Sequence, residues 1–144
     1  MGYDNTIYIV GPADDLKAIH DSLIVSLEHT SVAYSSGRLV FNTITRVFPD
    51  IQLVARLTRQ YPRTTAAIFF WAEYGECHGF AVYVIGIEEY REVGHDVPGD
   101  QVDENAADKA ARVIQDRYRS RIEQYLAMAS NMRPSTTDRN GFSR

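Results

Sequence analysis

Residues capable of chemistry gather at one predicted turn in the middle of the chain. Glu73, Glu76, Cys77 and His78 bring two carboxylates, a thiol and an imidazole together. Such groups can ligate zinc or support nucleophilic catalysis. A structural zinc site needs four ligands, usually in two spaced pairs, and the sequence has no second pair. In a strand, the adjacent Cys77 and His78 would point to opposite faces, so we interpret the cluster as a polar turn and predict no bound metal.

The other titratable residues match no catalytic pattern. His20, His29 and His95 are scattered, and no Ser-His-Asp order can be built from them. The loop-rich segment 94–100 lacks the repeated glycines and the lysine of phosphate-binding motifs. Its aspartates also lack the alternating spacing of a calcium loop. The sequence therefore predicts a protein that is not an enzyme and needs no cofactor.

The formal net charge of −4 does not favour generic nucleic-acid binding through bulk electrostatics, and the charge is unevenly distributed along the chain. From residue 103 onward there are eight Lys/Arg and six Asp/Glu, whereas residues 1–102 carry seven Lys/Arg and thirteen Asp/Glu. An acidic body suits solubility, as an ordinary solvated surface, which is the simpler interpretation, or binding to a basic partner surface. The candidate contact residues are Glu73, Tyr74, Glu76, Glu88, Glu89 and Glu92.

Two features keep nucleic-acid binding as an alternative. Arg117 and Arg121 are four residues apart on one face of a predicted helix, where they could contact phosphate or an acidic partner. The aromatic run Phe69-Phe70-Trp71 resembles the stacking strands of single-strand RNA readers. Acidic residues flank both features. For the aromatic run, the simpler interpretation is therefore an apolar sheet that the C-terminal helix covers. For the two arginines, it is a solvated helix surface with internal ion pairs.

The first half of the chain predicts alternating strands and helices. β-branched and aromatic residues predict a strand at 6–10, which Gly11-Pro12 stops. Leu16, Ile19 and Leu23 recur at helical spacing and predict a helix at 13–28. Ser35-Ser36-Gly37 predicts the turn of a hairpin at 31–45. A second helix is expected from Pro49 to Gln60, ended by Tyr61-Pro62.

The second half predicts the centre of the sheet and a long helix. Residues 65–71 are apolar on both faces, which is typical of a central strand, and residues 80–87 form the returning strand after a turn at 75–79. The polar segment 88–97 extends that strand or forms a short edge strand. The last helix is expected at 103–131, with Ile114, Tyr118 and Ile122 on its apolar stripe.

These elements predict a single α+β domain at 1–131 and a flexible tail at 132–144. The expected fold is a ferredoxin-like antiparallel sheet with helices on one face, an extra hairpin strand and a long C-terminal helix.

Several segments resemble one known family, the Api-like proteins with a ferredoxin-like domain. These short proteins of unassigned function are encoded by phages, plasmids and other mobile elements. The resemblance covers roughly residues 4 to 88, in the segments Asn5-Thr6-Ile7-Tyr8-Ile9-Val10-Gly11-Pro12, Phe41-Asn42-Thr43, Tyr61-Pro62, Phe70-Trp71-Ala72-Glu73-Tyr74-Gly75-Glu76 and Gly79-Phe80. The chain departs from the family at Thr45-Arg46-Val47-Phe48, where a Trp and paired prolines are typical. It also lacks a Trp-Gly-rich segment before that point.

The resemblance implies an origin on a mobile element. Together with the missing chemistry, it leads to the hypothesis of a non-enzymatic interaction protein that docks onto a host or defence protein, as an inhibitor. A homodimer through the 88–97 edge or the long helix is a further expectation. A single cysteine, no signal-peptide layout at residues 1–5 and no apolar run of membrane-spanning length predict a cytoplasmic protein without a membrane partner.

Overall fold

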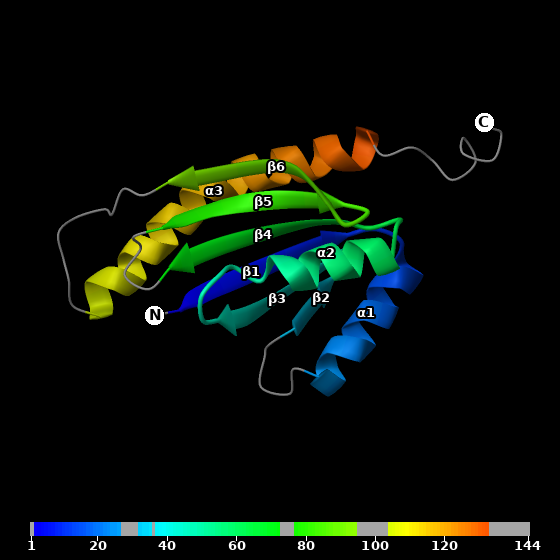
Figure 1. The fold of residues 1–144 in the computed structure, drawn as a ribbon, viewed down its shortest axis with the longest axis horizontal. Coiled ribbons are helices and arrows are strands. Elements are labelled where there is room, and N and C mark those ends of the chain that lie inside the picture. The colour runs from blue at the N-terminus through cyan, green and yellow to red at the C-terminus, as the bar shows by residue number, and fades with distance from the viewer. Residues whose placement is uncertain (1, 27–31, 36, 73–76, 95–103, 133–144) are drawn as a thin grey trace.

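The chain folds as a single antiparallel sheet with helices on both faces (Figure 1). The computed structural model describes residues 2–26, 32–35, 37–72, 77–94 and 104–132. Within these residues the elements are β1 (Tyr3–Val10), α1 (Ala13–Ser26), β2 (Val32–Ser35), β3 (Arg38–Thr45), α2 (Ile51–Gln60), β4 (Thr65–Ala72), β5 (His78–Val84), β6 (Ile87–Gly94) and α3 (Glu104–Met132). The α+β class, the antiparallel sheet and the long C-terminal helix are confirmed.

The first strand lies in the middle of the sheet. Among the described strands the order is β2-β3-β1-β4-β5-β6, and every neighbouring pair is antiparallel. Along β1 the residues alternate, with Asn5, Ile7 and Ile9 fully buried and their neighbours half-buried or exposed. Period-two alternation is what a strand with one fully covered face requires.

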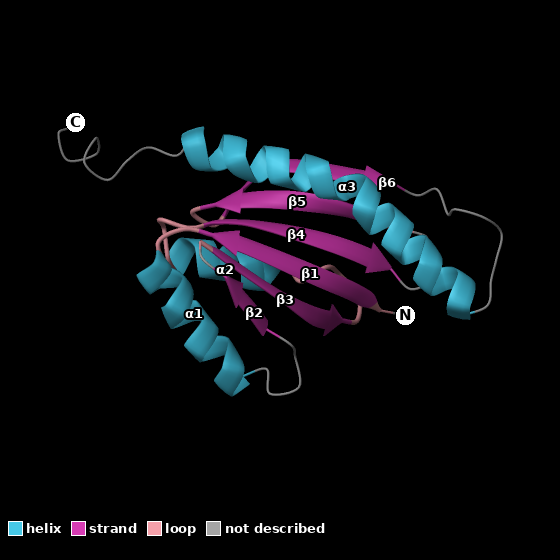
Figure 2. Ribbon diagram, turned by 180° about the vertical axis from the view of Figure 1, so that it is seen from behind, coloured by secondary structure: helices cyan, strands magenta, loops and turns pink. Residues whose placement is uncertain are grey.

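Two hydrophobic cores lie on the two faces of the sheet (Figure 2). On one face α1 and α2 cover the inward side chains of β1, β3, β4 and β5. On the other face α3 packs on β4 and β5 through a stripe that includes Ile114, Tyr118, Ile122 and Leu126. The burial of Ile114, Tyr118 and Ile122 confirms these positions of the predicted stripe. Leu126 is also buried, although the prediction did not include it, and Tyr125 beside it is half-buried.

The hairpin of β4 and β5 is buried along its whole length. Every residue of both strands is buried, with Ala66 and Ile68 facing α1 and α2 and Phe69 and Trp71 facing α3. This explains why the sequence of β4 is apolar on both faces, as predicted. Gly79 is required here, because a Cβ at this position would lie 2.0 Å from the carbonyl oxygen of Glu92 on β6.

The returning strand ends earlier than the sequence predicts. A strand at 80–87 is wrong, because β5 ends at Val84 and a two-residue turn, Ile85-Gly86, leads into the separate strand β6. Both turn residues have positive φ, 51° and 75°, which matches the right-handed twist of the flanking strands. A β-branched residue rarely adopts this conformation. Ile85 therefore gives no sequence signal for a turn. In the structure, a hydrogen bond from the Gly86 amide to Thr58 Oγ1 on α2 fixes the position of the turn.

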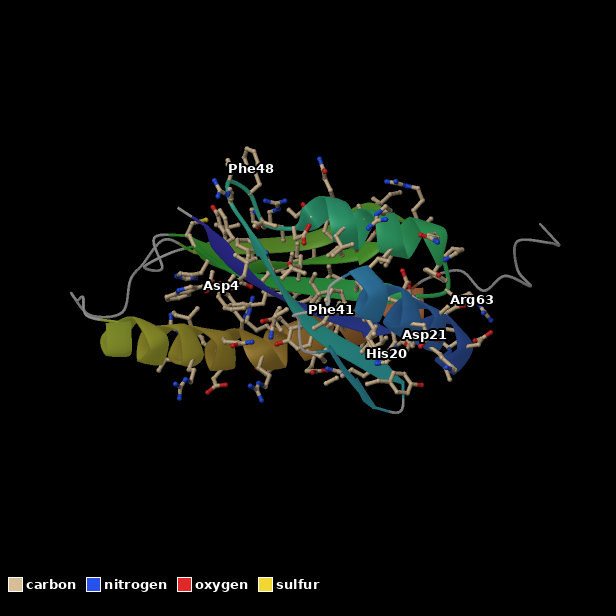
Figure 3. All side chains as sticks on the ribbon, turned by 90° about the horizontal axis from the view of Figure 1, so that it is seen from below. Asp4, His20, Asp21, Phe41, Phe48 and Arg63 are labelled. Carbon is tan, nitrogen blue, oxygen red and sulfur yellow. The ribbon has the colours of Figure 1, made fainter. Side chains whose placement is uncertain are left out.

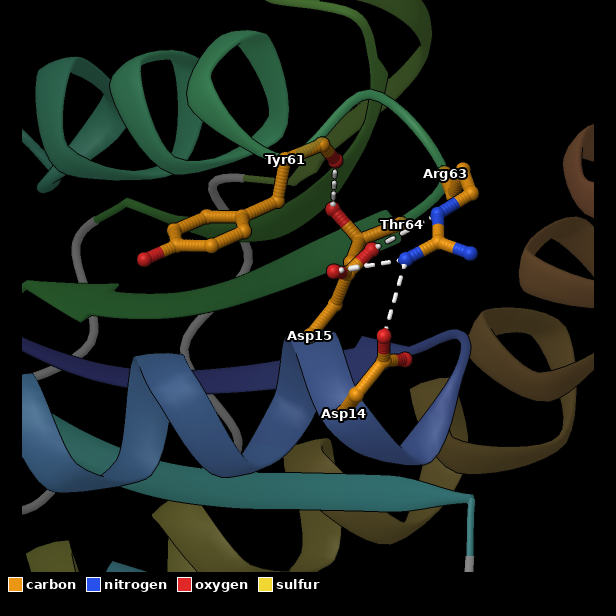
Figure 4. A network of polar contacts seen from close by, with 5 residues as sticks. All are labelled: Asp14, Asp15, Tyr61, Arg63 and Thr64. Atoms are coloured by element: carbon orange, nitrogen blue, oxygen red, sulfur yellow. Dashed lines mark hydrogen bonds and ion pairs between the residues drawn. The ribbon is translucent and has the colours of Figure 1, made fainter. Parts of the chain in front are cut away.

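An arginine ties the start of α1 to the connection between α2 and β4 (Figure 4). The Arg63 guanidinium donates to Asp15 at 2.9 and 3.1 Å and to Asp14 at 3.3 Å. The hydrogen bond from Arg63 holds the pKa of the Asp14 carboxyl below its ordinary value. These carboxylates also lie in the first turn of α1, where the helix dipole favours negative charge.

The remaining boundaries are close to those predicted. Helix α2 begins at Ile51, two residues after Pro49, and α3 extends through Met132, one residue into the predicted tail. Residues 133–144 of the predicted tail, and residues 95–103, which include most of the loop-rich segment 94–100, lie outside the described residues. None of the helices, as far as the structure describes them, combines the length and the apolar character needed to cross a membrane.

The packing of α3 on the sheet predicts unequal effects along this helix. Ile122→Ala removes a side chain that is 1% exposed, and we expect the free energy of unfolding to fall by about 2–5 kcal/mol. Met128→Ala on the same helix, where the side chain is 45% exposed, should change it by less than about 0.5 kcal/mol. Urea denaturation of both variants measures the difference. Equal effects would contradict the assignment of the buried face.

Candidate functional site

The predicted acidic contact surface is not continuous in the structure. Glu73, Tyr74 and Glu76 lie outside the described residues. On the edge strand β6, Glu88 and Glu89 are exposed and Glu92 is half-buried. A bulge lies in this strand, because Tyr83 pairs with Glu88 whereas the preceding residue, Val82, pairs with Tyr90. Glu89 is therefore the extra residue of the bulged strand.

The bulge places Glu88 and Glu92 on opposite faces of the sheet. Glu88 accepts a hydrogen bond from Tyr83, which belongs to the core beneath α1 and α2. Glu92 accepts a hydrogen bond from Arg121 on α3, which covers the other face. Strict alternation would put residues 88 and 92 on one face, so sequence reasoning groups together two side chains that the structure separates.

Much of the predicted charge is already paired within the chain. Arg121 Nε lies 2.8 Å from Glu92 Oε1, and Arg91 Nη2 lies 2.7 Å from Glu88 Oε1. The proposed basic helix surface and the proposed acidic strand thus meet in one ion pair. Arg117 is exposed on the same helix. Charged side chains on an edge strand such as β6 are one way in which proteins prevent the strand from pairing with another sheet.

The aromatic residues of β4 face the inside of the molecule. Phe69 and Trp71 are 3% and 6% exposed and lie beneath α3, and Phe70 is buried on the opposite face of the strand. The structure therefore confirms the simpler interpretation, in which the C-terminal helix covers this part of the sheet. These rings offer no surface on which a nucleic-acid base could stack.

His78 belongs to the same aromatic cluster. Its side chain is 1% exposed and stacks on Trp71 with ring centroids 5.7 Å apart. Its Nδ1 lies 3.2 Å from the Tyr118 hydroxyl of α3. Cys77, by contrast, is half-buried. Within the described residues, no group of three or more His, Cys, Asp and Glu side chains is arranged to hold a metal ion.

Two highly exposed apolar side chains lie in the segment between β3 and α2. We call residues 46–50 the Phe48 loop. Phe48 and Val47 are 73% and 68% exposed, and Ile44 at the end of β3 is 81% exposed. Figure 3 shows Phe48 pointing away from the body of the protein. Single exposed apolar residues are ordinary, but two large ones side by side on one loop mark a candidate contact site.

A buried asparagine fixes the conformation of this loop. Asn5 on β1 is 1% exposed, and its Nδ2 donates to Thr43 Oγ1 at 3.2 Å and to Thr45 Oγ1 at 3.1 Å. Thr45 Oγ1 in turn donates to the carbonyl oxygen of Phe48 at 2.6 Å. The Asp50 amide donates to Asn5 Oδ1 at 3.4 Å. Both ends of the loop are thus tied to one buried side chain, which lowers the entropy lost when Phe48 is held by a partner.

A shallow hollow lies beside the loop. It has a volume of about 500 Å³, and its walls come from the loop, the first turn of α2 and Arg91 on β6. The lining residues are Thr45, Val47, Phe48, Pro49, Asp50, Ile51, Gln52 and Arg91. The surface therefore combines a projecting aromatic ring with an adjacent recess, both on the side of the sheet that carries α2.

Sequence reasoning missed the Phe48 loop for a physical reason. Apolar residues just before a helix often pack back onto its first turns, so Val47 and Phe48 carry no signal of exposure. The one sequence hint is that Thr45-Arg46-Val47-Phe48 differs from the pattern of the Api-like family, and the resemblance to that family stays a prediction. Comparison with known proteins gives no match, whether to a family model, to a curated protein or to a solved structure.

Removing the asparagine should loosen the loop and the start of α2. Asn5→Ala removes the acceptor of the Asp50 amide and the hydrogen bonds that Asn5 donates to two threonine hydroxyls. We expect a loss of about 1–3 kcal/mol in the free energy of unfolding. Asn42→Ala, an exposed position on β3, serves as the control and should cost less than about 0.5 kcal/mol. Amide hydrogen exchange at Asp50 should speed up only in the first variant. Unchanged exchange there would show that Asn5 does not hold the loop.

The stability should fall at alkaline pH through Tyr83. Burial, followed by the charge of Glu88, raises the pKa of its hydroxyl from 10.0 to about 12. The neutral hydroxyl therefore stabilises the fold below pH 10, and this contribution is lost as the pH rises from 10 to about 12. In urea denaturation across this range, wild type should lose stability more steeply than Tyr83→Phe, which has no proton to lose. Parallel pH profiles would contradict the assignment.

Proposed function

We propose that this chain is a protein-interaction module without enzymatic activity of its own, and that the Phe48 loop is its anchor. The observation that carries the proposal is the exposure of Val47 and Phe48, at 68% and 73%, on a loop held by Asn5. Interfaces gain most of their energy from a few large side chains that enter a pocket on the partner. The partner is therefore a protein with an apolar pocket that accepts an aromatic ring.

The ferredoxin-like part of the fold is also a proposal. The element order from β1 to β4 is β-α-β-β-α-β, with α1 and α2 on the same face of the sheet. This order supports a ferredoxin-like unit, to which β5, β6 and α3 are added. The origin on a phage or plasmid, and a host or defence protein as the inhibited partner, stay predictions from the resemblance.

Nucleic-acid binding is the weaker alternative. Its stacking residues, Phe69 and Trp71, are buried beneath α3. One of its two cationic residues, Arg121, is bound to Glu92. The Phe48 loop, in contrast, is exposed and rigidly connected, so a protein partner is the better-supported choice.

Photo-crosslinking tests the proposal while the partner is still unidentified. With p-benzoylphenylalanine at position 48, irradiation in cells of the source organism, or of its host, should give a discrete adduct with one protein. The same amino acid at position 34, where the native Tyr34 is 45% exposed on β2, should not give that adduct. Identical adducts from both positions, or none from position 48, would count against the Phe48 loop.

A substitution then measures the energy of the contact. Phe48→Ser should weaken binding of the crosslinked partner by at least about 2 kcal/mol, which is roughly 30-fold in Kd. The stability of the free protein should change by less than about 0.5 kcal/mol, because the ring is exposed. Calorimetry of binding and urea denaturation give the two values. An unchanged Kd would contradict the assignment of Phe48 as the anchor.

A further inference from the structure

Tyr90 on β6 and Tyr125 on α3 lie face to face at the β6 edge of the sheet. Their ring centroids are 3.7 Å apart and their planes differ by 10°. In the other aromatic contacts of the described residues, the centroids are 5.6–6.2 Å apart. Aromatic pairs usually lie about 4.5–7 Å apart. These two rings are therefore in closer parallel contact than ordinary aromatic packing requires.

The pair lies between the core and solvent. Phe80 on β5 packs against both rings, with its centroid 5.6 Å from that of Tyr90 and 6.1 Å from that of Tyr125. Both tyrosines are half-buried, whereas Phe80 is fully buried in the core beneath α3. A small solute therefore reaches the two tyrosines from solvent, while the core keeps their rings together.

A carboxylate lies within reach of the Tyr90 proton. The Tyr90 hydroxyl donates to Glu92 Oε1 at 3.3 Å, and Arg121 Nε donates to the same oxygen at 2.8 Å. A hydrogen bond with Tyr125 is the main reason that the pKa of Tyr90 lies above its ordinary value, so this phenol keeps its proton at neutral pH. A phenol that loses an electron becomes a strong acid, and a hydrogen-bonded carboxylate can accept its proton.

We propose that Tyr90 and Tyr125 form an oxidation site, at which a one-electron oxidant joins the two rings as dityrosine. The oxidant belongs to the class of peroxide-derived radicals and high-valent metal complexes. Each tyrosine gives one electron to one equivalent of oxidant and releases one proton, which passes from Tyr90 to Glu92 and from Tyr125 to water. The two phenoxyl radicals then combine through a bond between their Cε carbons, next to the hydroxyl groups.

The coupling is complete when both rings are aromatic again. The hydrogen on each bonded Cε moves through solvent to the phenoxyl oxygen of its own ring, which restores two phenols. The protein has then lost two electrons, taken up by two equivalents of oxidant, and two protons. Because the rings are already in contact, the step needs no encounter between two chains. The product ties the edge strand β6 to α3, on the side of the sheet away from the Phe48 loop.

Photo-oxidation of the full chain tests the proposal. The oxidant is a ruthenium(II) tris-bipyridine complex, which light and persulfate convert into a one-electron oxidant. We expect blue dityrosine fluorescence, an intact mass lower by two hydrogen atoms, and a product that still migrates as a single chain. Digestion with trypsin should leave peptide 64–91, which contains Tyr90, joined to peptide 122–139, in which Tyr125 is the only tyrosine.

Matched variants show whether the coupling belongs to this pair. Phenylalanine keeps the ring but has no phenolic proton to lose, so Tyr90→Phe and Tyr125→Phe should each lower the yield by about tenfold or more. Tyr34→Phe, at a position that is 45% exposed on β2, should leave the yield unchanged. Circular dichroism confirms folding, and either of the first two variants suffices if the other does not fold.

The position of the cross-link decides the outcome. A bond between Tyr90 and Tyr125 within one chain, formed in a yield that does not depend on protein concentration, supports the proposal. Four results would overturn it: covalent dimers alone, a cross-link at other tyrosines, oxidation of the pair without a bond, or equal yields from wild type and Tyr90→Phe.

Discussion

The whole structure depends on burying both faces of the β4–β5 hairpin. Side chains of β4 alternate between two cores, so neither face can be left in water without exposing Ile68 on one side or Phe69 on the other. Helix α2 covers the first face with help from α1, and α3 covers the second. Because apolar burial is the dominant favourable term in folding, α3 is an integral layer of the domain, although it follows all the strands in sequence.

Covering this hairpin also decides which chemistry the chain can present. The rings of Phe69 and Trp71 on β4 and the imidazole of His78 pack beneath α3. His78 stacks on Trp71 and contacts the hydroxyl of Tyr118 on α3. Charged residues at the sheet edge pair across elements, as Arg121 does with Glu92. Among the described residues, the Phe48 loop is left with exposed apolar side chains at Val47 and Phe48.

Local patterns determined most of the elements. Helical spacing in α1 and α3, the doubly apolar β4 and the stops at Gly11-Pro12 and Tyr61-Pro62 act within a few residues, so they can be recognised without the fold. The Ile85-Gly86 turn could not be recognised, because Ile85 adopts a positive φ that its side chain disfavours. The bulge at Glu89 was equally hidden, since it exists only in the pairing of β6 with β5.

By itself, then, the amino-acid sequence determined the order and type of the elements and the double burial of β4, because these follow from short-range periodicity. Only the tertiary structure decided which polar and apolar side chains meet solvent. The exposure of Phe48 depends on Asn5, which is 43 residues away in sequence but joined to the loop by hydrogen bonds through Thr45. The extent of this sheet face that α3 covers likewise depends on where α3 crosses the strands, and no local pattern contains that position.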